Sequence, residues 1–332
     1  MSLIDPQPRI TLIGAGAIGG WLGAQLAHAG ARVSAVARGQ TLLSLQRDGL
    51  TLRSAGSEQR VAVHAVAGSE ALGPQDLVIL AVKAPALPEV APLVTPLLGP
   101  NTVVLTAMNG VPWWFFEGGF GGALNGARLQ TIDPAGAIAS AIPARHVIGG
   151  VVHASCSTDA PAVVRHHFGN SLIIGEPGGG ESGRLQALAA LLQRAGPAVT
   201  VSPQIQKDIW YKLWGNLTIN PISALTGATT DRILDDDLVR HFISTVMLEA
   251  KAIGEHIGIP IAQQPEDRHA VTRKLGAFRT SMLQDVQARR PVELDALVAV
   301  VCELGQRVGV PTPYTDALLG LSRLQARTLG LY

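Results

Sequence analysis

The sequence is poor in charged residues. Asp, Glu, Lys and Arg make up only 15% of the 332 residues, against about a quarter in typical globular domains, and the formal net charge is +1. No basic block stands out, so the composition gives no electrostatic support for a nucleic-acid partner. Hydrophobic residues reach 47%, and a chain of this length can form two domains with separate cores. The apolar excess also leaves enough surface for a subunit interface, as in a homodimer.

Cysteine pairs, a secretion signal and a membrane helix are also lacking. Cys156 and Cys302 lie far apart and form no CxxC motif, which fits a reducing cytoplasm. The N-terminal residues MSLIDPQPR have no apolar run behind a basic start, so no secretory signal is expected. The longest uncharged stretch, between Glu89 and Glu117, contains four prolines that would break a membrane helix repeatedly. We therefore expect a cytoplasmic protein with no membrane partner and no metal site.

Short apolar runs alternate with helical or turn segments in the first half of the chain. These runs are continuous rather than alternating with polar residues, which is typical of parallel strands covered on both faces. We therefore predict a doubly wound α/β sheet, extended by strands between about 147 and 175 and by a helix over 183–195. The other predicted strands cover residues 9–14, 32–38, 61–66, 76–82 and 102–107.

Beyond about residue 203 the pattern is helical. Residues 206–219 and 237–257 carry apolar residues at helical spacing, and a last long helix is predicted from Pro291 to Gly309. The chain is therefore predicted to divide into a first domain over residues 1–203 and an all-helical domain over 204–332.

The first predicted strand leads into a turn with the spacing GxGxxG. A helix to about His28 follows this turn, and a second strand comes at the right distance. In a dinucleotide-binding fold such glycines allow the tight turn, the close approach of the pyrophosphate and the packing of the helix. A merely glycine-rich turn is the alternative, but the strand and helix around it favour a Rossmann site. The cofactor-binding candidates here are Gly14, Ala15, Gly16, Ala17, Ile18 and Gly19.

The end of the second predicted strand favours NADP(H) as the cofactor. NAD enzymes place an Asp or Glu there to bind the ribose 2′-hydroxyl, but residues 36–38 are Val-Ala-Arg. Arg38 offers a planar cation suited to a 2′-phosphate. Lys83, directly after the strand over 76–82, can reach the same cofactor edge, the alternative being a solvated loop lysine. Residues 1–203 are thus predicted as an NADP-binding Rossmann-like domain.

Three polar residues of the helical part share one helix face. Lys212, Asn216 and Asn220 are spaced four apart within the apolar segment WYKLWGNLTINP. Pro221 predicts that the helix kinks or ends there and directs Asn220 outward. The alternative is a solvated helix face with two asparagines near a terminus.

Two further polar residues flank a proline-broken connection near the C-terminus. Ser281 and Glu293 lie in TSMLQDVQARRPVELD, on either side of Pro291. Taken alone, Ser281 fits a helix cap, and Glu293 fits a first-turn acid that the helix dipole favours. Composition and spacing carry these two residues no further.

Several segments together resemble the ketopantoate (2-dehydropantoate) reductase family. They are GAGAIGGWLGAQLAHAGARVSAVARG, DLVILAVKA, MNGV, KLWGNLTINPISALT and SMLQDVQARRPVELD. They occur in the family's order across residues 9–315, and those in the helical part are far more specific than the glycine turn. The resemblance implies a Rossmann domain followed by a helical substrate-binding and catalytic domain. It also implies NADPH-dependent reduction of a 2-oxo acid, 2-dehydropantoate to pantoate, in pantothenate and coenzyme A biosynthesis.

The resemblance implies roles for residues at matching positions. Lys212 resembles the lysine that polarises the keto oxygen and supplies its proton. Glu293 resembles the glutamate that closes the site near the cofactor and the substrate hydroxyl, and Asn109 the asparagine touching both nicotinamide ribose and substrate. The chemistry is coherent, because hydride arrival leaves an alkoxide that a nearby cation stabilises and protonates. The other implied contacts are substrate binding by Asn216, Asn220 and Ser281, the last to the carboxylate, and 2′-phosphate binding by Arg38 and Lys83.

Two features depart from the family pattern. The segment after Asn109 is longer, from Trp113-Trp114-Phe115-Phe116 to about residue 134. We favour an aromatic plug packed at the domain interface over a substrate lid. A further substrate-binding asparagine is replaced near Thr229-Thr230. Because selectivity depends on such contacts, a paralogue acting on a related 2-oxo acid is the main alternative.

Two other functions compete with this interpretation. Another two-domain dehydrogenase, of the hydroxyisobutyrate or opine type, does not explain Ser281 and Glu293 together with the Lys-Asn-Asn helix. A non-catalytic NADP-sensing regulator is disfavoured by the intact Lys212. Oxidation of NADPH in the presence of 2-oxo acids distinguishes an enzyme from a regulator.

Overall fold

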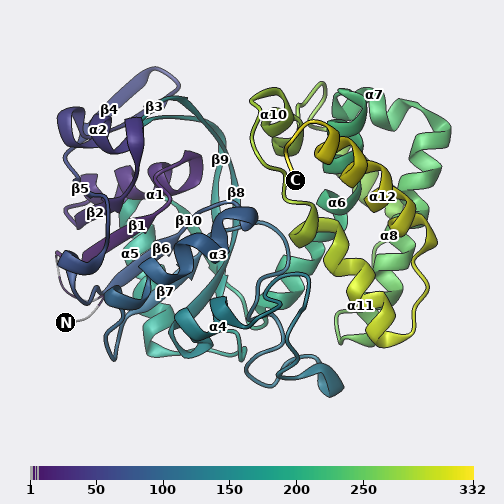
Figure 1. The fold of residues 1–332 in the computed structure, drawn as a ribbon, viewed down its shortest axis with the longest axis horizontal. Helices are drawn as coiled ribbons and strands as arrows, with labels where there is room; N and C mark the ends of the chain where they lie inside the picture. The colour runs from purple at the N-terminus through teal and green to yellow at the C-terminus, as the bar shows by residue number, and fades with distance from the viewer. Residues whose placement is uncertain (1–2, 4, 6) are drawn as a thin grey trace. The chain divides into compact units, whose positions relative to one another are not determined.

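The computed structural model describes residues 3, 5 and 7–332, and its contacts divide the chain into two compact units. The first unit comprises residues 1–108 and 136–208, and the second comprises 109–135 and 209–332. The division by contacts thus falls a few residues after the predicted boundary of 203. It also assigns the long segment after Met108 to the second unit, because that segment packs on the helices (Figure 1).

The first unit is built on one sheet, and its described residues form ten strands (Figure 1). Its central order, β5-β2-β1-β6-β7-β8, is parallel throughout and is the order of a doubly wound dinucleotide-binding sheet. The predicted fold class is therefore confirmed. The strands are β1 (Arg9–Ile13), β2 (Arg32–Val36), β3 (Leu50–Ser54), β4 (Ser57–Val61), β5 (His64–Val66), β6 (Leu77–Leu80), β7 (Val103–Thr106), β8 (Val147–Ala160), β9 (Val163–Gly175) and β10 (Ala198–Val201).

The single strand predicted over 61–66 is two strands in the structure. β4 ends at Val61 and pairs antiparallel with β3, whereas β5 begins at His64 and pairs in parallel with β2. The apolar run is continuous in sequence, but its two ends have different partner strands. Long-range pairing, rather than local pattern, divides it.

Alternate strand residues face opposite sides of the sheet. One core cluster takes Ile10 and Leu12 of β1 and every second residue of β6 and β7, and it also holds the buried faces of two helices. The helices on this face are α1 and α5, which contact each other. The α-helices of the unit are α1 (Ala17–His28), α2 (Gly39–Asp48), α3 (Leu87–Val90), α4 (Ala137–Ala141) and α5 (Gly183–Ala195), with 3-10 turns η1 (Glu70–Leu72), η2 (Ala84–Ala86), η3 (Ala91–Leu93), η4 (Thr95–Leu97) and η6 (Ala144–His146).

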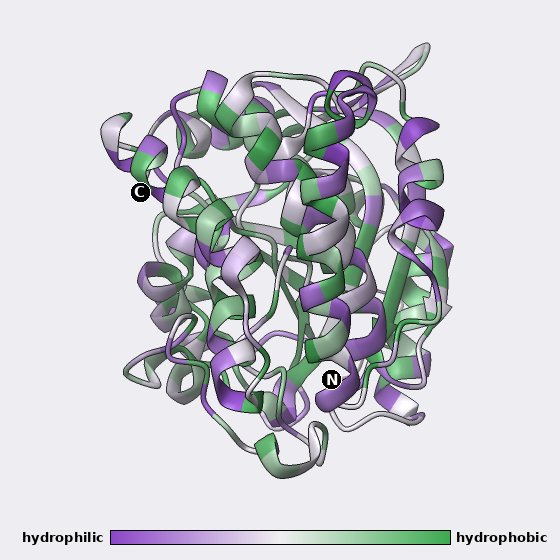
Figure 2. Cartoon of the chain, turned by 90° about the vertical axis from the view of Figure 1, so that its right-hand side faces the viewer, coloured by the Kyte–Doolittle hydropathy of each residue, from purple (hydrophilic) through white to green (hydrophobic). Residues whose placement is uncertain are grey.

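The second unit is helical among its described residues, and Figure 2 shows purple and green positions alternating along its helices. Such amphipathic helices bury one face against their neighbours. No helix in the described part of the chain is both long and apolar enough to cross a membrane. The helices are α6 (Ile205–Thr226), α7 (Thr230–Asp235), α8 (Asp237–His256), α9 (Pro265–Arg273), α10 (Ser281–Gln287), α11 (Val300–Val308) and α12 (Pro313–Thr328), with the 3-10 turn η5 (Gly122–Leu124) and the π-helix η7 (Asp295–Ala299).

The C-terminal region differs from the single last helix predicted from Pro291. Residues 291–293 are not helical, and a π-helical stretch comes before α11. The helix ends as predicted at Gly309, which adopts a φ of +73°. A further helix, α12, follows, because Pro313 at its start is compatible with the first turn of a helix.

Candidate active site

The three glycines between β1 and the start of α1 differ in how much space surrounds them. Gly14 has a φ of +98°, and a Cβ there would lie 2.7 Å from the carbonyl oxygen of Ala81. A Cβ on Gly19 would lie 1.9 Å from the carbonyl oxygen of Gly14, so only glycine lets α1 approach the turn. A Cβ on Gly16, in contrast, would meet no atom within 4 Å. The turn is therefore closed on two sides and open at the start of α1.

This open side fits a phosphate group. Gly16 is the N-cap of α1, makes no side-chain cap, and is followed by a first turn without acidic residues. The first N–H groups of a helix lack intrahelical acceptors and carry the positive end of the helix dipole. A side chain at position 16 would fill the space in front of them. The residues of the turn thus fit the pyrophosphate of a dinucleotide.

A cavity of about 510 Å³ opens beside this turn within the first unit. The turn, the end of β2 and the start of α2 form one side, and the β8–β9 hairpin forms the other. The hairpin's contribution could not be predicted from local pattern, because the hairpin is remote from the turn along the chain. The lining residues are Gly14, Ala15, Gly16, Val36, Ala37, Arg38, Thr41, Thr158, Ala160, Pro161 and Ala162.

Arg38 lines this cavity from the position preceding α2. Its Nη1 donates to Oε1 of Glu89 in a short ion pair whose two side chains are about two-thirds exposed. The hydrogen bond and the charge of Glu89 raise the pKa of Arg38, and those of Arg38 lower the pKa of Glu89. Because both groups are solvated, water and salt weaken the pair and a stronger anion can replace Glu89. Lys83 is the N-cap of η2 after β6 and is not among the residues that line the cavity.

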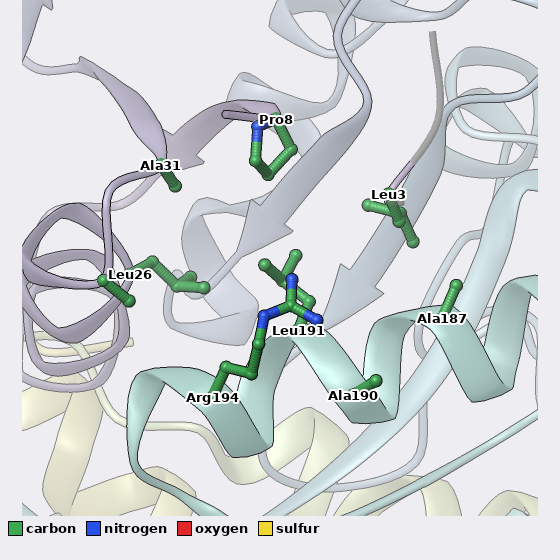
Figure 3. Close-up of a pocket in the computed structure, with 9 residues that line it drawn as sticks. Leu3, Pro8, Leu26, Ala31, Ala187, Ala190, Leu191 and Arg194 are labelled. Carbon is green, nitrogen blue, oxygen red and sulfur yellow. The ribbon is translucent and has the colours of Figure 1, made fainter. Parts of the chain in front are cut away.

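A second cavity in the first unit, of about 410 Å³, is not lined by a glycine turn. Figure 3 shows that it is lined almost entirely by apolar side chains, with Arg194 of α5 extending across it. Arg194 is the only charged residue among the described residues that line it. A cavity without an acid–base pair or a glycine turn is not a candidate for dinucleotide chemistry.

The polar stripe predicted in the second unit lies on α6. Lys212, Asn216 and Asn220 share this helix, and of the two outcomes predicted for Pro221, a kink or an end, the helix does not end there. It continues to Thr226, and Asn220 is almost fully buried. Nearly the whole length of α6 is buried, and this packing offsets the one backbone hydrogen bond that the proline removes.

The ammonium of Lys212 is held by Asn109. Nζ of Lys212 donates to Oδ1 of Asn109 at 2.9 Å, although the two residues are far apart in sequence. Gly110 follows with a φ of +81°, and a Cβ there would lie 2.4 Å from the carbonyl oxygen of Ala296. The N–H of Val111 donates to that same carbonyl at 3.0 Å. Only glycine allows this close approach, so the turn fixes Asn109 beside the π-helix η7.

Burial lowers the pKa of Lys212 from its ordinary 10.5 to about 8. The carboxylate of Glu293 opposes this shift, and the guanidinium of Arg268 adds to it. Glu293 is itself almost fully buried and directly precedes the helical residues that begin at Leu294. An ammonium with a pKa near 8 is mostly protonated at neutral pH and releases its proton far more readily than an exposed lysine. Lys212 therefore has the properties of a general acid.

The structure thus brings Lys212, Asn109 and Glu293 together. Ser281 is the first residue of α10 rather than its cap, which is Thr280. Among the described residues, no hydrogen bond joins Ser281, Asn216 or Asn220 to Lys212. Sequence reasoning missed Arg268, one of two arginines on α9, because no motif distinguishes it.

The long segment after Asn109 is anchored within the second unit. All four aromatic residues of Trp113–Phe116 are buried, and the ring of Phe115 lies 6.3 Å from that of Trp210 on α6. Both carboxylate oxygens of Glu303 on α11 accept backbone N–H groups, from Gln130 and Thr131, at 2.8 Å each. Burial would raise the pKa of Glu303, but these bonds and Arg307 outweigh it and lower the pKa. These contacts favour a packed element over a lid.

Thr229 and Thr230, where the resemblance predicts a replaced asparagine, serve the local fold. Thr229 is the N-cap of α7, and its hydroxyl donates to Asp231. Thr230 is buried; its Oγ1 donates to the carbonyl of Gly276 at 2.6 Å, and its N–H donates to the carbonyl of Phe278 at 3.0 Å. Both hydroxyls are therefore engaged within the unit.

Hydride transfer to a carbonyl needs a bound dinucleotide and a proton donor, and this chain contains a structure suited to each. It is an oxidoreductase of the two-domain dehydrogenase class. Residues 10–113 match the family model described as ketopantoate reductase PanE/ApbA, and residues 204–326 match that of its C-terminal domain. The chain belongs to the ketopantoate reductase family.

Relatives and solved structures agree with this family. The 2-dehydropantoate 2-reductase of Mesorhizobium japonicum is 47% identical over 98% of this chain and 99% of its own length. A solved structure from Ralstonia solanacearum MolK2, provisionally assigned as a ketopantoate reductase, is 58% identical with a TM-score of 0.94, covering 98% of this chain and 99% of that one. The 2-dehydropantoate 2-reductase of Geobacter metallireducens GS-15 is 26% identical with a TM-score of 0.84, covering 96% and 99%.

Proposed function

We propose that this chain reduces 2-dehydropantoate to pantoate with NADPH, as a step of pantothenate and coenzyme A biosynthesis. The relative from Mesorhizobium japonicum, which matches over nearly its whole length, carries the name of this activity. The observation that carries the proposal is the half-buried Lys212, which is held by Asn109 and has a pKa of about 8. This is the proton donor that reduction of a keto group requires.

The first unit supports NADPH as the hydride donor. The turn from Gly14 to Gly19 fits the pyrophosphate, and the neighbouring cavity extends to Arg38. Val36 and Ala37 at the end of β2 offer no carboxylate to a ribose 2′-hydroxyl. A 2′-phosphate, with its greater charge, would replace Glu89 as the partner of Arg38. Lys83 is proposed as a second contact to that phosphate.

NADPH held by the turn from Gly14 to Gly19 and by Arg38 would supply the hydride for the carbonyl carbon of the substrate. The π electrons of the C=O bond move to the oxygen, where the ammonium of Lys212 stabilises the forming charge and then transfers its proton. Asn109 keeps Nζ in place throughout, and the released amine regains a proton from solvent. Glu293 orients the substrate and moderates the loss of charge from Lys212.

The remaining site residues are proposed to bind the substrate. Asn216 and Asn220 can donate hydrogen bonds to its oxygens without adding a counter-charge, and the hydroxyl of Ser281 can donate to its carboxylate. Asn109 and Glu293 are also proposed to contact the cofactor. We further propose that the protein acts as a cytoplasmic homodimer, which light scattering on the purified chain would test.

A related 2-oxo acid is the second candidate substrate. It is favoured by the segment 109–135 and by Thr229 and Thr230, whose hydroxyls are engaged in local hydrogen bonds. A contact made to the substrate by an asparagine at that position would be missing here. The reaction chemistry would be the same, with a different group beyond the keto carbon.

The test is a panel of 2-oxo acids offered to the purified protein, with NADPH consumption followed by absorbance. We expect 2-dehydropantoate to give the highest kcat/KM. A different preferred acid would support the paralogue. No NADPH consumption with any acid, from a protein that still binds NADPH, would leave the non-catalytic regulator as the explanation.

A further inference from the structure

Arg268 of α9 packs against α6 next to Lys212. Its guanidinium carbon lies 5.5 Å from the centre of the Tyr211 ring, close enough for a cation–π contact. A Cβ on Gly215 would lie only 2.5 Å from Nε of Arg268 and 2.6 Å from Nη2. The guanidinium therefore fills the space that any side chain at position 215 would take. Tyr211 and Gly215 flank Lys212 on the same helix. These contacts therefore place the guanidinium of Arg268 beside Lys212, the proposed proton donor.

Arg268 has no acidic partner among the described residues. The other arginine of α9, Arg273, pairs with Asp235 at 2.8 Å, whereas Arg268 forms no ion pair with any residue that the structure describes. Its Nε is fully buried and lacks a hydrogen-bond partner. Burial lowers the pKa of the guanidinium, and Tyr211 opposes this shift. A partly buried cation without a counter-charge is costly unless a ligand supplies one.

The charges around Lys212 indicate what kind of ligand supplies the counter-charge for Arg268. Lys212 and Arg268 carry two positive charges, and Glu293 carries one negative charge, so these three groups have a net charge of +1. One carboxylate neutralises them. In a 2-oxo acid the carboxylate and the keto oxygen are on adjacent carbons, so two neighbouring cations can bind both at once. A planar guanidinium suits the carboxylate, and a lysine that can lose its proton suits the keto oxygen.

We propose that Arg268 binds the carboxylate of the 2-oxo acid substrate while Lys212 takes the keto oxygen. This deepens the proposed function and rests on it. Gly215 is then a specificity-determining position, because its lack of a side chain makes room for the guanidinium. The family resemblance implies only one contact to the substrate carboxylate, a hydrogen bond from Ser281. Arg268 would add an ion pair to that hydrogen bond.

The test compares Arg268→Met, which keeps the apolar stem but removes the charge, with Arg268→Lys and with Arg273→Met as the matched control on the same helix. The substrate is the acid that the unmutated protein reduces best. We expect Arg268→Met to raise KM roughly 10- to 100-fold, as loss of a charge-assisted contact does, with a much smaller change in kcat. Arg268→Lys should recover part of this loss, and Arg273→Met should behave like the unmutated protein.

The methyl ester of the same acid separates carboxylate binding from a structural role. In the unmutated protein the ester should bind far less well than the acid, and in Arg268→Met the two should become nearly equal. Gly215→Ala should reproduce the effect of Arg268→Met, and the double variant should add little to either. An acid-to-ester ratio that Arg268→Met leaves unchanged would overturn the proposal, even if KM rises.

A binding measurement keeps this test independent of turnover. Calorimetric titration of 2-dehydropantoate into the protein saturated with NADP⁺ should give weaker binding for Arg268→Met than for Arg273→Met. If the unmutated protein binds the acid but reduces no acid of the panel, the proposed function fails and the role of Arg268 stands. Equal binding by the two variants would refute the role of Arg268 and leave the reaction untouched.

Discussion

The glycine turn of the first unit and the lysine site of the second are both suited to stabilise a negatively charged group, but they are built in opposite ways. The turn uses the backbone of six consecutive residues, Gly14 to Gly19, and needs no side chain at its open position. The lysine site uses side chains from segments far apart in sequence, Asn109, α6, α9 and the residue before the π-helix. A site built from backbone groups can be recognised in consecutive residues, whereas a site built from distant side chains forms only after the chain folds.

The two key cations differ in the same way. Arg38 is exposed, and its partner Glu89 raises its pKa, so it keeps its charge under all ordinary conditions. Burial lowers the pKa of Lys212 to about 8, so it can give its proton away. A permanent charge suits the binding of a phosphate, and a labile proton suits the reduction of a ketone. The surroundings, more than the residue type, separate binding from catalysis.

The largest expected effect comes from Lys212→Ala. Loss of both the charge and the proton should lower kcat by roughly 10²- to 10⁴-fold while NADPH binding stays nearly intact. Lys212→Arg should rescue little, because a guanidinium with a pKa above about 12 is a poor acid. Glu293→Ala should mainly weaken substrate binding. Steady-state kinetics beside NADPH titration by fluorescence tests this, and a near-normal kcat in Lys212→Ala would sink the mechanism.

Trp114→Ala tests whether the second site depends on the packing of the segment that carries Asn109. Trp114 is almost fully buried, so its removal should lower the free energy of unfolding by about 3–5 kcal/mol. The kcat/KM ratios among 2-oxo acids should not change. Denaturant unfolding and the substrate panel are the measurements. A reordered substrate preference with little loss of stability would revive the lid interpretation.

Arg38→Ala should affect the cofactor site alone. Loss of a charge-assisted contact to the 2′-phosphate should raise the KM for NADPH roughly 10- to 100-fold and leave the KM for NADH unchanged. The unmutated protein should strongly prefer NADPH. Equal efficiency with NADH and NADPH before mutation would contradict the assignment of Arg38, whereas the glycine turn would keep its role.

The pH dependence of reduction should report Lys212. The lysine must be protonated to act as the acid, so kcat/KM should fall as pH rises through about 8, by about tenfold per pH unit above it. Glu293 raises this pKa and Arg268 lowers it. Glu293→Gln should therefore move the descending limb to lower pH, and Arg268→Met should move it to higher pH. A limb that neither substitution moves would belong to another group.

Glu89→Gln gives the smallest expected effect and probes the competition for Arg38. The carboxylate of Glu89 holds Arg38 in this structure, so its removal should lower the KM for NADPH by roughly two- to threefold. High salt should reduce the difference between the variant and the unmutated protein. An increase in KM would mean that Glu89 orients Arg38 for the phosphate rather than competing with it.

Several features of the fold and the site were predictable because they depend on neighbouring residues. The glycine turn between a strand and a helix and the stop of α11 at Gly309 follow from local backbone preferences. One expectation failed where distant contacts decided the outcome, because the apolar run around residue 62 divides between two partner strands. Local pattern also left open whether the helix ends at Pro221, and α6 continues beyond it.

Local residue patterns were enough to predict the doubly wound sheet, the glycine turn, the lack of an acid at the end of β2 and the spacing of Lys212 with Asn216 and Asn220. Each of these is a matter of residue order within one segment. The folded chain was needed to see that Asn109 holds Lys212, that Gly110 packs against Ala296 and that Arg268 fills the space next to Gly215. The pKa of Lys212 belongs to this second group, because burial lowers it and burial is a property of the whole packed unit.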